Sequence, residues 1–213
     1  MLRWHRFLVG VAALIALGPA AGEAPPLAPD VAVQQARSVI DATLKEVLQV
    51  LAQKILSEAD KKKRIEEIAY AHFDFDTMSR LILARNWRHF SQAQRDAFVA
   101  EFKKHLSLTY GENLMRYKNE TVATTSARAE KNGDVKVRTK IVRSTADPLL
   151  IDYRLRQRET TWYVIDVIIE GISLVANFRT QTQAIISDVG ADRLIERLRK
   201  KNAERAQQKK TTP

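Results

Sequence analysis

The hydrophobic pattern of the chain changes from a helical period to a strand period and back. Between residues 33 and 117, apolar residues recur at spacings of three and four, which is typical of amphipathic helices. From residue 121 to 158 the period is two, and apolar residues alternate with charged ones. A helical period returns after residue 171. This order predicts an α+β fold, with N-terminal and C-terminal helices packed on a curved antiparallel sheet.

The stretch from Trp162 to Glu170 is a strand candidate that is apolar on both faces. A strand of this kind must be covered on both faces, or must line an apolar space. We interpret it as a wall of the core, which could also border an apolar cavity. Strict alternation would place Tyr163, Ile165, Val167 and Ile169 on one face, and Trp162, Val164 and Ile168 on the other.

Capping residues predict where the helices begin and end. Asp30 can cap a long first helix whose apolar stripe extends to Ile55. Ser57 with Asp60, and Ser91 with Gln94, have the spacing of capping boxes. Asp76 and Asp192 can cap two further helices, and Gly190 can end the helix before the last. The expected helices span about residues 30–55, 61–71, 76–82, 91–117, 176–190 and 192–202.

Residues 1–24 are typical of a secretory signal peptide. Basic Arg3 and Arg6 precede an apolar segment, residues 7–17, which is too short for a permanent membrane anchor, and small residues follow. An uncleaved N-terminal anchor is the alternative. We therefore expect a cleaved signal and a periplasmic location, with a linker at residues 25–30, one domain at 31–202 and a polar tail at 203–213.

The chain carries a formal net charge of +10 and has no cysteine. The missing cysteines exclude disulfides, thiolate metal sites and cysteine nucleophiles. Such a charge suggests nucleic acid as a partner, but export argues against it and favours anionic lipid head groups or an acidic protein. The basic cluster at residues 61–64 is a solvated helix face or a contact for phosphate or an acidic partner. The charged faces of the strands at 134–142 and 149–158 predict a strongly basic sheet surface.

Catalytic and metal-binding motifs are absent from the sequence. The histidines after the signal, His72, His89 and His105, lack metal-ligand spacing, and no nucleophile elbow, P-loop or dinucleotide fingerprint occurs. Asp166 lies within an apolar strand, where a carboxylate can act as a base. The alternative is an ion pair with one of the many arginines. We expect neither a catalytic residue nor a metal site.

Several segments between Phe73 and Phe178 form a recognisable set of motifs. These segments are FDFD at 73–76, RL at 80–81, ARNW at 84–87, SQAQR at 91–95, FVAEF at 98–102, TY at 109–110, IDYRL at 151–155, WYVIDV at 162–167 and EGISL at 170–174. In this order they resemble the MlaC-type proteins, also called toluene-tolerance proteins. Two departures from the family pattern are Ala84, where glycine is expected, and Asn86, where histidine is expected.

The resemblance implies a periplasmic carrier of phospholipid within an ABC-type system that maintains outer-membrane lipid asymmetry. It implies a cystatin-like sheet with an apolar pocket, no enzymatic activity, and no cofactor other than phospholipid as cargo. The implied partners are the phospholipid, an inner-membrane ABC transporter complex with its substrate-binding-domain subunit, and an outer-membrane lipoprotein–porin complex.

Within this implied fold, the apolar stripes supply the residues that we expect to line a lipid-binding pocket. An enzyme that uses Asp166 as a base and a basic adaptor protein with a filled core are the alternatives. The expected pocket residues are Phe75, Met78, Leu81, Ile82, Phe102, Leu106, Tyr110, Leu114, Val137, Ile141, Ile151, Tyr153, Val164, Val167, Ile169, Ile172 and Val175.

Overall fold

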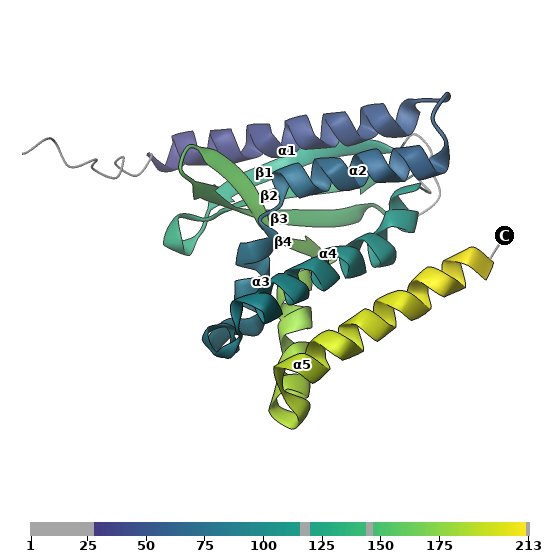
Figure 1. Ribbon diagram of the computed structural model, residues 1–213. Helices are drawn as coiled ribbons and strands as arrows, with labels where there is room; N and C mark the ends of the chain where they lie inside the picture. Colours follow the sequence, from purple (N-terminus) through teal and green to yellow (C-terminus); the bar gives the residue numbers. More distant parts are fainter. Residues whose placement is uncertain (1–27, 116–119, 144–146, 212–213) are drawn as a thin grey trace, which may run out of the picture.

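The computed structural model describes residues 28–115, 120–143 and 147–211 (Figure 1). Tyr117, the expected end of one helix, lies outside these ranges. The elements in chain order are α1 (Pro29–Ala52), α2 (Glu58–His72), α3 (Phe75–Leu83), the 3-10 helix η1 (Ala84–His89), α4 (Gln92–Met115), β1 (Thr121–Ala129), η2 (Lys131–Gly133), β2 (Val135–Val142), β3 (Leu149–Arg158), β4 (Thr161–Ile169), β5 (Ile172–Ser173) and α5 (Leu174–Thr211).

The five strands form one antiparallel sheet in the order β1-β2-β3-β4-β5. Helices α1 and α2 run along the sheet, and α3, α4 and α5 gather near β4 (Figure 1). Each strand pairs with its sequence neighbour, so short turns suffice; Glu159-Thr160 and Glu170-Gly171 connect the last three strands. The α+β prediction is confirmed.

Two of the expected helix starts are wrong. Pro29 opens α1, Ala28 makes no side-chain capping bond, and Asp30 lies within the first turn. Asp74, rather than Asp76, caps α3, because its Oδ1 accepts a hydrogen bond from the Thr77 backbone N–H at 2.9 Å.

One expected capping box is complete, at Ser91 and Gln94, whereas at Ser57 the Asp60 carboxylate accepts from the Ser57 hydroxyl at 2.6 Å. The Asp60 backbone N–H donates to Ser57 Oγ at 3.1 Å. Ser91 and Gln94 form the reciprocal pair: the Gln94 N–H donates to Ser91 Oγ at 3.2 Å, and the Ser91 N–H donates to Gln94 Oε1 at 2.9 Å. These bonds satisfy N–H groups that have no partner within a helix. Local capping therefore determines where α2 and α4 begin.

Strict alternation fails in β4 because the strand contains a bulge. The pairing passes from Arg154–Asp166 directly to Leu155–Val164, so Ile165 has no opposite residue on β3. One extra residue reverses which side chains share a face. As a result Trp162, Val164, Val167 and Ile169 all pack toward one core cluster, although alternation had assigned them to opposite faces.

The interior contains two main apolar clusters. The first lies between the sheet and α1 and includes Ala36, Ile40 and Val137. The second joins α3, α4 and α5 around Phe98 and Phe102, whose rings stack with centroids 6.2 Å apart. Helices α3, α4 and α5 thus form a second packed core, distinct from the core between the sheet and α1.

Helix α5 changes direction at Gly190, whose φ of 79° and ψ of −176° break the helix as expected. Its second half continues to Thr211, so residues 203–211, expected as a tail, are helical. This half is anchored on α4 by Asn202, which donates from Nδ2 to Glu101 O at 2.9 Å and accepts from His105 Nδ1 at 2.9 Å. Burial lowers the pKa of His105, which favours the neutral ring in this contact.

Ala84 has a strained backbone conformation. Its φ of 49° and ψ of −123° at the end of α3 lie where a Cβ clashes with the backbone and glycine is favoured. The resemblance led us to expect glycine at this position, and glycine would adopt this conformation without the clash of a Cβ. Ala84→Gly is therefore expected to raise the free energy of unfolding by about 1 kcal/mol, measured by urea denaturation. An unchanged or lower value would show that the strain is absent.

Candidate functional site

A cavity of about 660 Å³ lies between the sheet and helices α1, α2 and α4. Most of the side chains on its wall are apolar. α1 contributes Leu44, Val47, Leu48 and Leu51; α2 and the segment after it contribute Ile65, Ala69, Tyr70 and Phe73; α4 contributes Leu106, Tyr110, Leu114 and Met115; the strands contribute Val122, Ile141, Leu149, Ile151, Tyr153, Val167 and Ile169; and α3 and α5 contribute Phe75 and Leu174.

The spacing of the cavity-lining side chains follows the geometry of the element on which they lie. On α4, Leu106, Tyr110 and Leu114 recur every four residues, so they lie one above another on the same helix face. On β3, Ile151 and Tyr153 alternate with residues of the opposite face. The cavity therefore forms where a helical stripe and a strand face meet without filling the space between them.

The structure brings nine of the expected pocket residues together on the cavity wall. They lie on α3, α4, β2, β3 and β4, and their contact with a lipid stays a prediction. These residues are Phe75, Leu106, Tyr110, Leu114, Ile141, Ile151, Tyr153, Val167 and Ile169.

The other expected residues lie away from the cavity. Ile172 is 61% exposed, because it forms the short β4–β5 hairpin at the sheet edge. Val137 and Val164 pack in the cluster between the sheet and α1. The remaining five face the separate core of α3, α4 and α5, which strand and helix periods alone cannot distinguish from a cavity: Met78, Leu81, Ile82, Phe102 and Val175.

None of the expected pocket residues lies on α1 or α2, although both helices form walls of the cavity. The signal was present in the first helix, whose apolar stripe is unusually wide. Leu44, Val47, Leu48 and Leu51 cover more of the helix circumference than one contact with the sheet requires. For α2 the signal was weaker, because the charged run at 61–64, which includes the wall residue Lys62, interrupts the apolar pattern at the start of the helix.

The interior of the cavity favours neutral groups. Burial raises the pKa of Tyr153 to about 12, and a hydrogen bond with Thr139 opposes this only in part. Tyr153 therefore remains a neutral phenol at any physiological pH. Thr139 donates its own hydroxyl proton to the Ile151 carbonyl at 2.9 Å. Polar atoms on this wall are thus engaged within the protein, which leaves an apolar surface for a ligand.

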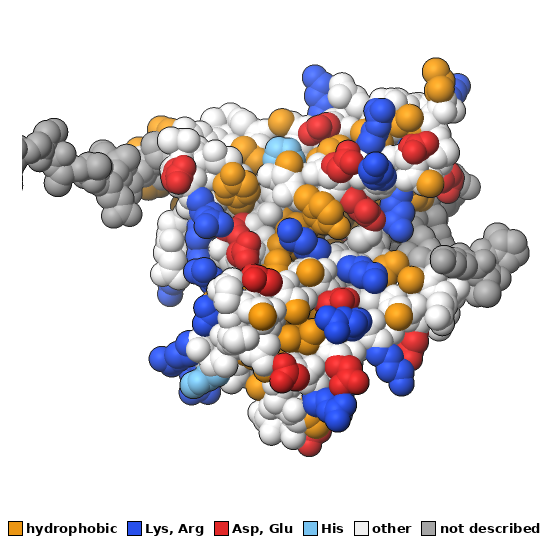
Figure 2. Space-filling model, viewed as in Figure 1, with side chains coloured by type: hydrophobic (Ala, Val, Ile, Leu, Met, Phe, Trp, Pro, Cys, Tyr) orange, Lys and Arg blue, Asp and Glu red, His pale blue; other side chains and the backbone are white. Residues whose placement is uncertain are grey.

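Charged groups on the cavity wall come from two places. Lys62, Glu66 and Lys103 lie along the gap between α2 and α4. Glu120, just before β1, and Arg143, just after β2, form the second group, and Arg143 Nε donates to the Asp147 carbonyl at 2.9 Å. Figure 2 shows hydrophobic side chains in the gap between α2 and α4, with Lys or Arg side chains crossing it.

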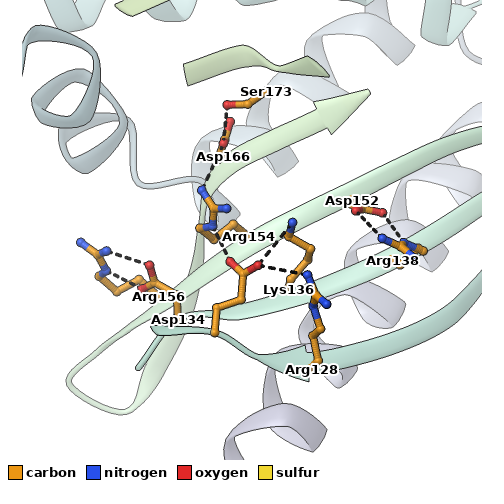
Figure 3. Close-up of polar contacts among 10 residues, drawn as sticks. Arg128, Asp134, Lys136, Arg138, Asp152, Arg154, Arg156, Asp166 and Ser173 are labelled. Carbon is orange, nitrogen blue, oxygen red and sulfur yellow. Dashed lines mark hydrogen bonds and ion pairs between the residues drawn. The ribbon is translucent and has the colours of Figure 1, made fainter. Parts of the chain in front are cut away.

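The face of the sheet that carries the ionic side chains is less basic than predicted. Arg138 Nε donates to Asp152 Oδ1 at 3.0 Å, and Arg156 Nε donates to Asp134 Oδ1 at 2.7 Å (Figure 3). Arg154 Nε donates to Glu130 Oε2 at 2.7 Å, and Lys136 and Arg128 also pair with Glu130. The arginines are largely neutralised by carboxylates on neighbouring strands and turns, so they offer fewer free cations to a partner.

Asp166 is buried and makes hydrogen bonds within the protein. It is 1% exposed and does not line the cavity. Its Oδ2 accepts from Ser173 Oγ at 2.6 Å and from Arg154 at 3.5 Å, and its Oδ1 accepts from the Val175 N–H at 3.1 Å (Figure 3). These contacts agree with the ion-pair interpretation and connect β4 to the start of α5.

Within the described residues, no group of three or more His, Asp or Glu side chains could hold a metal ion. In the same part of the chain, no helix is both long enough and apolar enough to cross a membrane.

Three comparisons relate this architecture to known proteins. The chain is 28% identical over 109 residues to toluene tolerance protein Ttg2D of Pseudomonas putida, a match that spans 51% of each protein. The chain thus covers about half the length of that relative. Its fold is similar to that of a phospholipid-binding protein from Ralstonia solanacearum, solved in complex with a phospholipid. That comparison has a TM-score of 0.72 and 24% identity, and covers 81% of this chain and 99% of the other.

At 24% identity, the structural likeness shows the fold. The family model described as MlaC protein matches residues 41–200, which include every residue on the cavity wall. Because this match extends over most of the chain, the protein belongs to the MlaC family.

Proposed function

We propose that this protein is a soluble phospholipid carrier that holds the acyl chains of its cargo in the cavity. The observation that carries the proposal is the apolar space of about 660 Å³ between the sheet and α1, α2 and α4. Its size lies within the range of about 300–1,000 Å³ that is typical of ligand pockets. The phospholipid bound to the structurally similar protein from Ralstonia solanacearum supports the same choice of ligand.

The physical argument concerns the cost of exposing acyl chains to water. Burying each methylene group gains about 0.8 kcal/mol, so a lipid cannot cross water alone at a useful rate. A carrier needs an apolar cavity that binds by shape and leaves the polar head group outside. No covalent chemistry is required, which agrees with the place of Asp166 in a structural network.

The proposed setting is the periplasm, after cleavage of the N-terminal signal. The carrier would move phospholipid between an inner-membrane ABC transporter complex, through its substrate-binding-domain subunit, and an outer-membrane lipoprotein–porin complex. Membership of the MlaC family and the signal-like pattern of residues 1–24 support this setting. A basic adaptor with a filled core is less well supported, because the described part of the core contains the cavity.

The test is native mass spectrometry of the mature protein, purified from the periplasm without detergent and followed by lipid extraction. We expect a mass excess that matches bound phospholipid, and phospholipid in the organic extract. A bare protein that also fails to take phospholipid from added vesicles would contradict the proposal and favour the adaptor.

A further inference from the structure

The gap between α2 and α4 is lined by two facing rows of residues. Each row has a spacing of four, so its members lie on one helix face. Glu66 accepts a hydrogen bond from Ser107 Oγ. The Lys62 side chain packs against the backbone of Gly111. A Cβ atom at this position would lie 3.3 Å from Lys62 Cε. We call this set the α2–α4 seam; its members are Lys62, Glu66 and Tyr70 on α2, and Lys103, Ser107 and Gly111 on α4.

Lys103 is the cation of the seam without a carboxylate partner among the described residues. Its Nζ lies 5.4 Å from the ring centroid of Tyr70 and 5.2 Å from that of Phe75. Ring faces attract an ammonium group but provide no oxygen acceptor for its three N–H donors. Lys62, by contrast, lies 3.9 Å from Glu66. The ammonium of Lys103 is therefore held at the cavity wall with N–H donors available to an acceptor on a ligand.

The charge of the seam matches a phosphodiester. Two ammonium groups, Lys62 and Lys103, face one carboxylate, Glu66, so one positive charge is uncompensated at the edge of an apolar cavity. A phosphodiester carries one negative charge and oxygen acceptors, and ammonium–phosphate hydrogen bonds are among the stronger ones in proteins. Arg143, the other cation on the wall, already donates to the Asp147 carbonyl.

We propose that the α2–α4 seam is the phosphate-binding site of the carrier, with Lys103 as its main ligand and Lys62 beside it. This proposal rests on the proposed function. The acyl chains lie against the apolar wall, and the head group emerges between α2 and α4. The seam then distinguishes lipids that carry a phosphate from neutral lipids with the same acyl chains, whereas the cavity alone would bind both by shape.

The test compares two lipids on delipidated protein. Phosphatidylglycerol and diacylglycerol with the same fluorescent acyl chain are titrated into the wild-type protein and three variants. Lys103→Met is expected to weaken phosphatidylglycerol binding about tenfold and to leave diacylglycerol binding unchanged. Lys103→Arg, which keeps the charge, should retain most of the preference.

Lys104→Met is the matched control, because Lys104 is the exposed neighbour on α4 and does not line the cavity. It should bind both lipids like the wild-type protein.

An equal loss for both lipids in Lys103→Met, or no loss in either, would overturn the seam as a phosphate site. If the wild-type protein bound neither lipid, the carrier proposal itself would fail. Inorganic phosphate should give no saturable binding; saturable binding without lipid discrimination would assign the seam to free phosphate instead.

Discussion

Filling the cavity is expected to remove bound phospholipid from the purified protein. Ile151 lies on the cavity wall of β3, and Ala69 lies on the wall formed by α2. The double variant Ile151→Trp, Ala69→Trp places two indole groups in space that the acyl chains would need. We expect the lipid recovered per protein to fall at least about tenfold, because each displaced methylene forfeits about 0.8 kcal/mol. The measurement is lipid extraction and quantification after purification without detergent.

The free energy of unfolding of the same double variant distinguishes a cavity from a packed core. Inserting large side chains into a filled core costs about 1–3 kcal/mol each, whereas an existing void accommodates them. Leu150→Trp is the matched control, since Leu150 precedes Ile151 on β3, has its side chain on the opposite face and is 44% exposed. The control should retain its lipid. Normal lipid content in the double variant would show that the acyl chains lie elsewhere.

Asp166→Ala is expected to lower the free energy of unfolding by about 3 kcal/mol. The variant leaves the Val175 N–H and the Ser173 hydroxyl without the carboxylate that now accepts from both. Ser173 Oγ also accepts from the Ala176 N–H at 2.9 Å, so the start of α5 depends on this network. Urea denaturation followed by circular dichroism provides the measurement.

Asp152→Ala is the control for a more accessible ion pair. Asp152 is buried, but its partner Arg138 has a side chain that is 50% exposed and remains hydrated without it, so the expected loss is smaller than for Asp166→Ala. Equal losses in the two variants would show that the network of Asp166 contributes no more than a surface pair. A stable Asp166→Ala protein that lost a catalysed turnover would instead revive the enzyme hypothesis.

Local signals in the sequence predicted the secondary structure well. The alternation in residues 149–158 predicted β3 with its observed bounds, and Gly190 predicted the break in α5. The capping box at Ser91 predicted the start of α4, whereas Ser57 caps α2 at Glu58, three residues before the expected start at about residue 61. These features depend on neighbours within a few residues, so they are visible in the chain itself.

Two errors arose where distant segments decide the outcome. The bulge at Ile165 depends on the register between β3 and β4, and it reversed the predicted faces of β4. The expected basic surface did not account for the ion pairs that Glu130 and Asp134 form with Arg154 and Arg156 of β3. No local pattern contains the partner strand, so neither result could be read from the strand alone.

The sequence by itself determined that the chain has amphipathic helices and a sheet with one dry face, because hydrophobic period and capping are local properties. It also carried the motifs of the MlaC family. Only the tertiary structure decided which apolar side chains fill a core and which surround a void. Phe102 and Leu106 lie one turn apart on α4, yet Phe102 packs against Phe98 while Leu106 lines the cavity. The physical reason is that a cavity is space between elements, and its walls depend on the distance at which helices α1, α2 and α4 pack against the sheet.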